Sequence, residues 1–128
     1  MIKNILLVAL GGAVGSVARY LLSRAVDGTA MAAFPLGTMA ANVLGCLAIG
    51  VVVGLASGAG APVSQEMKLL LTTGFCGGFT TFSTFMNESV TLIKGGDIMT
   101  CALYIGASVA LGLVAAAGGL QLSKLYFQ

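Results

Sequence analysis

The chain has 128 residues, of which 58% are hydrophobic and only 8% are charged. Soluble domains carry about 25% charged residues, so six Lys/Arg and four Asp/Glu are too few to keep a body of this size in water. These figures exclude a soluble enzyme, and a net charge of +2 provides no basic surface for a nucleic acid.

The histidine and cysteine content excludes further classes of function. The sequence contains no histidine, which removes the Ser-His-Asp and Cys-His nucleophile systems and every His-ligated metal site. Its three cysteines, Cys46, Cys76 and Cys101, are far apart and lie in apolar runs, which is typical of free buried thiols. We therefore expect that the protein is not an enzyme.

The charged residues divide the chain into four apolar stretches, each long enough for a bilayer crossing of about 20 residues. The sequence therefore predicts an all-α integral membrane protein, a single four-helix domain over residues 1–128. Residues 125–128 resemble the remnant of a purification tag and carry no functional argument. The transmembrane helices are expected at residues 4–25, 36–57, 67–93 and 98–123.

The positive charges are balanced between the two sides of the predicted membrane domain. Lys3, Lys68 and Lys124 fall on one side, and Arg24 and Lys94 fall on the other. The positive-inside rule therefore gives almost no preferred orientation. We expect the chain to insert both ways and to pair with an inverted copy of itself.

The third stretch contains the most informative segment, TTGFCGGFTTFSTF at residues 72–85. Three glycines within five residues, followed by Ser/Thr hydroxyls, favour a helix that breaks near Gly77-Gly78 and restarts near Thr80-Thr81. A break frees backbone groups that cost several kcal/mol each in hydrocarbon, and such breaks persist where they line a cavity or bind an ion. The alternative is a kinked packing helix in which Ser/Thr side chains bond to the main chain.

Two other predicted helices carry uncharged hydrogen-bonding groups. Thr38 and Asn42 are four residues apart and share one helix face, as do Tyr104 and Ser108. Any one of these side chains would suit an inter-helix hydrogen bond worth about 1 kcal/mol. Three helices with such groups, and no fixed mid-membrane cation, indicate a neutral hydrogen-bonding track, whose Asn42 N–H groups an anion could use.

The remaining candidates have two interpretations each. The phenylalanines of the third stretch suit a core, but a phenyl edge carries partial positive charge and can stabilise an anion. Glu88 is either an interfacial cap or a gatekeeper at a pore mouth. Arg19 either reaches the membrane interface or makes a vestibule electropositive.

Three motifs together resemble one family over the whole chain. They are Gly12-x-x-Gly15-x-x-x-Arg19-Tyr20, then Pro35-Leu36-Gly37-Thr38 with Asn42, then GGFTTFSTF at residues 77–85. This pattern is similar to that of the Fluc (CrcB) bacterial fluoride channels. The resemblance implies an antiparallel, dual-topology homodimer in the bacterial cytoplasmic membrane. Its two pores would export fluoride passively and lower the cytoplasmic concentration, and a structural Na+ would lie at the dimer interface.

The resemblance also implies roles for individual residues. Gly112 stands where some relatives continue the polar track with a hydroxyl, which puts the outer part of that track in doubt. Glu88 and Arg19 would lie at the pore entrance, and the carbonyls of Gly77 and Thr80 would bind Na+. The fluoride pore would be formed by Asn42, Phe82 and Phe85, with a polar track of Ser83, Thr38, Tyr104 and Ser108.

Two other functions fit the four apolar stretches. A proton-coupled exporter of the small multidrug-resistance type also has four spans, but it needs a carboxylate in mid-membrane. The first span has none, and Glu88 lies near the end of the third. A non-transporting membrane scaffold would need no more than the glycine-rich helix faces.

Overall fold

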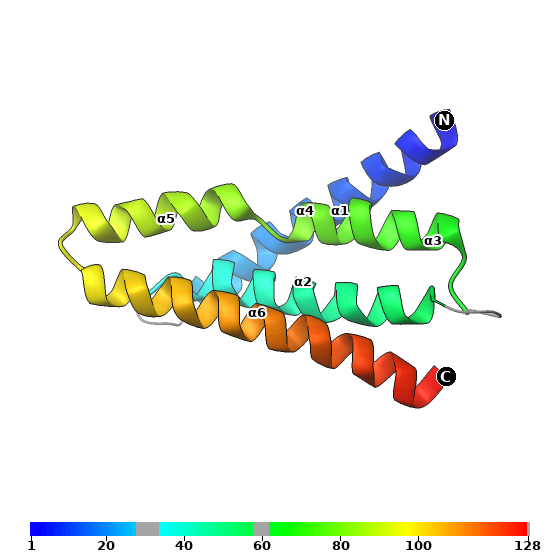
Figure 1. Ribbon diagram of the computed structural model, residues 1–128. Helices are drawn as coiled ribbons and strands as arrows, with labels where there is room; N and C mark the ends of the chain where they lie inside the picture. Colours follow the sequence, from blue (N-terminus) through cyan, green and yellow to red (C-terminus); the bar gives the residue numbers. More distant parts are fainter. Residues whose placement is uncertain (28–33, 58–61, 128) are drawn as a thin grey trace.

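Helices form all the regular structure in the parts of the chain that the computed structural model describes, residues 1–27, 34–57 and 62–127. Within these ranges, three helices are long and apolar enough to cross a membrane. They are α1 (Ile2–Asp27), α2 (Leu36–Leu55) and α6 (Ile98–Phe127), and α6 includes three of the four residues that resemble a tag. Both termini lie at the end of the molecule where α3 begins (Figure 1).

Between α2 and α6 the chain forms an interrupted helical unit. It consists of α3 (Gln65–Leu69), the π-helix η1 (Leu70–Cys76), the short α4 (Gly77–Phe79) and α5 (Phe82–Lys94). The segment from α3 to α4 lies along α1 and α2, whereas α5 lies along the first half of α6 (Figure 1). The stretch expected to span the membrane at 67–93 is therefore not one continuous helix.

Glycines bring α2 and α6 together at the level of the backbone. A Cβ at Gly119 would overlap with the carbonyl oxygen of Leu47, and a Cβ at Gly50 would overlap with that of Ala116. Both helices remain continuous through this contact, so their backbone groups stay bonded within each helix. The contact therefore needs no polar side chain.

A second glycine contact joins α1 to η1 and α4. A Cβ at Gly74 would lie 3.1 Å from the Cα of Gly11, and a Cβ at Gly15 would lie 3.0 Å from the amide nitrogen of Phe79. Such small residues permit close helix packing in lipid. This contact holds the first half of the interrupted unit against α1.

A tight turn connects α5 to α6. Gly96 has φ +80°, a conformation that side-chain-bearing residues rarely adopt, and the N–H of Asp97 donates to the carbonyl of Leu92 at 2.9 Å. The Asp97 carboxylate accepts from the N–H of Thr100 at 3.3 Å at the start of α6. The turn therefore sends α6 back along the interrupted unit.

Candidate functional site

The interruption lies at two threonines. Thr80 (φ −89°, ψ 159°) and Thr81 (φ −151°, ψ 121°) are extended, whereas Gly77 keeps helical angles (φ −61°, ψ −37°). The chain therefore leaves the helix after Phe79, later than the expected Gly77-Gly78. The glycines remain helical because α4 packs closely on α1, and the β-branched threonines are better suited to extended backbone.

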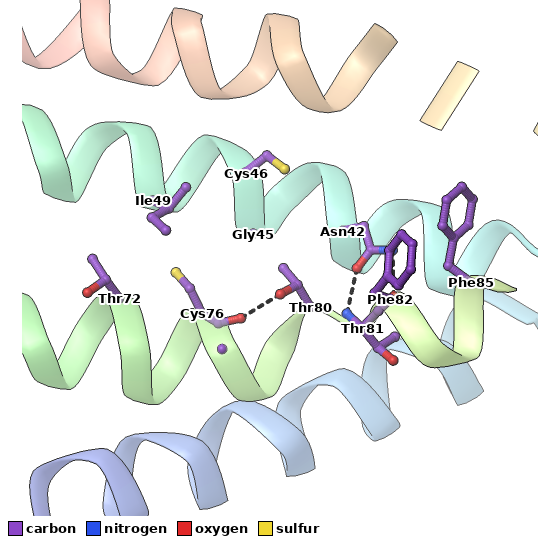
Figure 2. A pocket seen from close by; sticks show the side chains of 11 residues that line it. Asn42, Gly45, Cys46, Ile49, Thr72, Cys76, Thr80, Thr81, Phe82 and Phe85 are labelled. Atoms are coloured by element: carbon purple, nitrogen blue, oxygen red, sulfur yellow. Dashed lines mark hydrogen bonds between the residues drawn. The ribbon is translucent and has the colours of Figure 1, made fainter. Parts of the chain in front are cut away.

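Asn42 on α2 bonds to both backbone polar groups of Thr81, its N–H and its carbonyl. Its Nδ2 donates to the Thr81 carbonyl at 3.1 Å, and its Oδ1 accepts from the Thr81 N–H at 2.8 Å (Figure 2). Only one orientation of the amide satisfies both bonds. One N–H of Asn42 remains for another acceptor, and it belongs to a residue that lines a cavity.

The first turn of α5 begins with N–H groups that the interruption has released. The Thr81 hydroxyl accepts from the N–H of Thr84 at 3.2 Å and caps the helix. Within the described ranges, the N–H groups of Phe82 and Ser83 have no hydrogen-bond acceptor. This end of α5 therefore carries partial positive charge.

The short α4 and the extended Thr80 after it leave carbonyls without helical donors. Arg19 donates from Nε to the Gly78 carbonyl at 3.3 Å. No donor among the described residues reaches the carbonyls of Gly77 and Thr80, and both residues line the same cavity. Bare carbonyl oxygens are ligands that suit a hard cation such as Na+, so these two residues fit the ion that the resemblance implies.

A cavity of about 340 Å³ lies between α2 and the interrupted unit. Figure 2 shows Asn42 and the interruption at one end of it, next to Phe82 and Phe85. The Phe82 side chain is 73% exposed, whereas Phe85 is 7% exposed. The full lining is Asn42, Gly45, Cys46, Ile49, Thr72, Cys76, Gly77, Thr80, Thr81, Phe82 and Phe85.

The aromatic rings beside the cavity pack edge to face. The centroids of Phe82 and Phe85 are 6.2 Å apart with planes at 63°, and those of Phe85 and Tyr104 are 5.0 Å apart at 70°. The Tyr104 hydroxyl donates to Oε1 of Glu88 at 3.0 Å. This hydrogen bond connects Glu88, on α5, to the group of aromatic rings through Tyr104, which lies on α6.

The residues of the expected polar track differ in burial, and none of them lines the cavity. Thr38, Tyr104 and Ser108 are buried and do not line the cavity, and the Ser108 hydroxyl has no hydrogen-bond partner in the described part of the protein. Ser83 is exposed and also lies outside the cavity lining. Gly112 faces α2, where an added Cβ would lie 3.4 Å from the sulfur of Cys46. Sequence spacing placed these residues on common faces but did not show which faces open to the cavity.

Sequence reasoning missed two contacts at the interruption. It gave Asn42 a role toward an anion but did not identify Thr81 as its partner, and it did not connect Arg19 with Gly78. The two partners are 39 residues apart in the Asn42 contact and 59 residues apart in the Arg19 contact. No local sequence pattern predicts these contacts. However, a polar or charged side chain within an apolar helix, such as Asn42 or Arg19, indicates that it pairs with another polar group, for example a backbone carbonyl.

Comparison with known proteins identifies the family. Residues 6–120 match the family model described as "CrcB-like protein, Camphor Resistance (CrcB)". The chain belongs to the CrcB family. It is 48% identical over 128 residues to the fluoride-specific ion channel FluC of Chlorobaculum tepidum, with 98% of each chain covered. It is 45% identical over 122 residues to the FluC of Phocaeicola vulgatus, covering 95% of this chain and 99% of that one.

A third relative is the FluC of Geobacter sulfurreducens, which is 47% identical over 121 residues, or 94% of this chain and 97% of the relative. The predicted family is therefore confirmed. Membership in this family also confirms that the CrcB protein is not an enzyme, and its long apolar helices make it a multi-pass membrane protein.

Proposed function

We propose that this CrcB protein is a fluoride-selective channel that lets fluoride leave the cell passively across the bacterial cytoplasmic membrane. The observation that carries the proposal is the interrupted helix with its released donors, in a chain whose relatives are named fluoride-specific ion channels. In this proposal the segment from Gln65 to Lys94 also crosses the membrane, as the third of four crossings in chain order.

Fluoride is small and strongly hydrated, so a pore must replace the hydrogen bonds of water without holding the ion too tightly. The second N–H of Asn42, the N–H groups at the start of α5 and the edges of Phe82 and Phe85 are neutral donors of this kind. None of them forms the deep trap that a buried lysine would form. The fluoride path accordingly runs beside the interruption.

The polar track of this channel would continue along α6. The Ser108 hydroxyl is buried without a partner among the described residues, which is the state expected of a group that bonds a passing ion. Tyr104, Thr38 and Ser83 belong to the same proposed track, while Glu88 and Arg19 stand at its entrances. Fluoride would reach the buried members by displacing the Phe85 ring from Tyr104.

The working unit in this proposal is a homodimer of two inverted copies with two pores. One chain offers the carbonyls of Gly77 and Thr80, and an inverted copy would double these oxygens around one structural Na+ between the two interruptions. Such an ion would neutralise carbonyls that are otherwise unpaired in hydrocarbon. Reporter fusions at the C-terminus test the topology, since signal from both sides of the membrane is expected and signal from one side contradicts it.

The channel activity is tested with purified protein in liposomes loaded with potassium fluoride. After valinomycin is added, we expect rapid fluoride efflux on a fluoride electrode and negligible efflux from liposomes loaded with potassium chloride. Efflux that requires a proton gradient would identify a proton-coupled exporter instead. Liposomes that release no fluoride would indicate a non-transporting scaffold.

A further inference from the structure

Arg19 lies on the face of α1 that contacts α4. Gly12, Ser16 and Arg19 are spaced four and three residues apart, so they share one side of the helix. A Cβ added at Gly78 would lie 3.0 Å from the Ser16 hydroxyl, which leaves α4 directly against this side of α1. The next residue along the face, Arg19, therefore reaches the end of α4.

The partner of Arg19 is a carbonyl that the interruption has released. In a continuous helix the Gly78 carbonyl would accept from the N–H of Phe82, but the helix ends at Phe79. Arg19 is half-buried and donates to this carbonyl at 3.3 Å. Within the described ranges, no carboxylate lies within 4.0 Å of Arg19. The guanidinium thus meets backbone and not an acidic side chain.

Two side chains from different helices therefore flank the extended threonines. Arg19 on α1 bonds the residue two positions before Thr80, and Asn42 on α2 bonds Thr81. We propose that Arg19 is a positioning residue, whose hydrogen bond to Gly78 holds the end of α4 and so fixes where α5 begins beside the pore. This inference rests on the proposed channel function. In it, Arg19 acts through its hydrogen bond to the backbone and not by attracting anions with its positive charge.

A pair of variants separates the hydrogen bond from the charge. Glutamine carries Nε2 as many bonds from Cα as arginine carries Nε, whereas methionine has a methyl carbon at that place. We expect Arg19→Gln to conduct fluoride within about threefold of the wild-type rate, and Arg19→Met to lose about tenfold, as a lost hydrogen bond would give. If both variants lose the rate equally while Arg19→Lys keeps it, the charge is what matters and the inference is wrong. Wild-type rates in all three variants also overturn it.

A second measurement does not depend on fluoride. Hydrogen–deuterium exchange of the peptide covering residues 77–84, measured by mass spectrometry in lipid nanodiscs, should be about tenfold faster in Arg19→Met than in the wild type. Arg19→Gln and the control Arg24→Met should exchange at the wild-type rate, since Arg24 is exposed and its guanidinium lies 6.0 Å from the centroid of the Tyr20 ring.

The two measurements fail separately. If the wild type releases no fluoride but the exchange rates follow this order, the proposed function is wrong and the positioning role stands. If Arg19→Met exchanges at the wild-type rate, the positioning role is wrong whatever the flux.

Discussion

The protein contains two contacts built on glycine, and they differ in what happens to the backbone. Where α2 meets α6, Gly50 and Gly119 bring together two helices that continue unbroken past the contact. Where α1 meets α4, Gly15 and Gly78 allow an equally close approach, but the helix ends one residue after Gly78. Glycine therefore allows close helix packing in both places, but its small size does not by itself leave backbone groups unpaired in either.

The difference is a matter of hydrogen bonds. A continuous helix satisfies its own N–H and carbonyl groups, so the contact between α2 and α6 is purely steric. The interruption releases groups that cost several kcal/mol each in hydrocarbon, and Asn42 and Arg19 satisfy three of them. The groups that remain unpaired are the ones available to ions. Function is thus expected to depend on polar side chains at the interruption, and stability on glycines at the α2–α6 contact.

Among the variants that test this difference between the two contacts, Asn42→Ala has the largest expected effect on fluoride efflux. It removes both bonds to Thr81, and each of the two part-buried backbone groups then left unpaired costs up to about 1–3 kcal/mol. We expect fluoride efflux from liposomes to fall about a hundredfold, while the elution volume in size-exclusion chromatography stays that of the wild type. Asn87→Ala is the control, because Asn87 is exposed on α5 and should leave efflux unchanged. Wild-type efflux in Asn42→Ala would remove this residue from the pore.

Adjacent glycines on α6 test the steric contact. A Cβ at Gly119 would overlap with the backbone of α2, whereas a Cβ at Gly118 would have no atom within 4 Å. We expect Gly119→Ala to lower the free energy of unfolding by about 2 kcal/mol through overpacking, seen as a lower melting temperature in detergent. Gly118→Ala should be neutral or stabilising, since alanine favours a helix by up to about 1 kcal/mol over glycine. Equal melting temperatures would show that the contact is not tight.

Phe82→Ile tests whether a ring edge contributes to conduction. The substitution keeps an apolar side chain beside the cavity but removes the aromatic edge, so efflux should fall about tenfold, as the loss of about 1.4 kcal/mol would give. Phe75→Ile is the matched control, because Phe75 stacks on Phe79 at 5.5 Å and does not line the cavity. If both variants conduct alike, the rings serve packing and not the ion.

Much of the fold was predictable from the sequence because charges are rare in it. The spacing of charged residues indicated long apolar helices near residues 4–25, 36–57 and 98–123, and α1, α2 and α6 occupy these stretches. Glycines and hydroxyls at 72–85 indicated an interruption, although tertiary packing against α1 keeps Gly77 and Gly78 helical and moves the extended residues to Thr80 and Thr81. The connections at 28–33 and 58–61, and Gln128, lie outside the described residues.

The site was harder to predict than the fold. Asn42, Phe82 and Phe85 do share one cavity, and so do Gly77 and Thr80. However, helical periodicity only states which residues share a face, not which neighbour covers that face. The pairings of Arg19 with Gly78 and of Asn42 with Thr81 join segments that are far apart in the sequence, and the sequence pattern did not indicate the π-helix before α4. These features required the three-dimensional arrangement.

The smallest expected effect concerns the hydrogen bond between Tyr104 and Glu88. Tyr104→Phe keeps the ring against Phe85 but removes the donor to the carboxylate, and a bond worth about 1 kcal/mol should change efflux by about fivefold. Glu88→Gln keeps an oxygen that accepts from the hydroxyl, so its efflux should stay within about twofold of wild type if positioning of this side chain is what matters. If Glu88→Gln instead conducts much faster than wild type while Tyr104→Phe is unchanged, the carboxylate acts by repelling anions. The hydrogen bond between Tyr104 and Glu88 would then not contribute to conduction. The contact between α5 and α6 would serve packing only, as the glycine contact between α2 and α6 does.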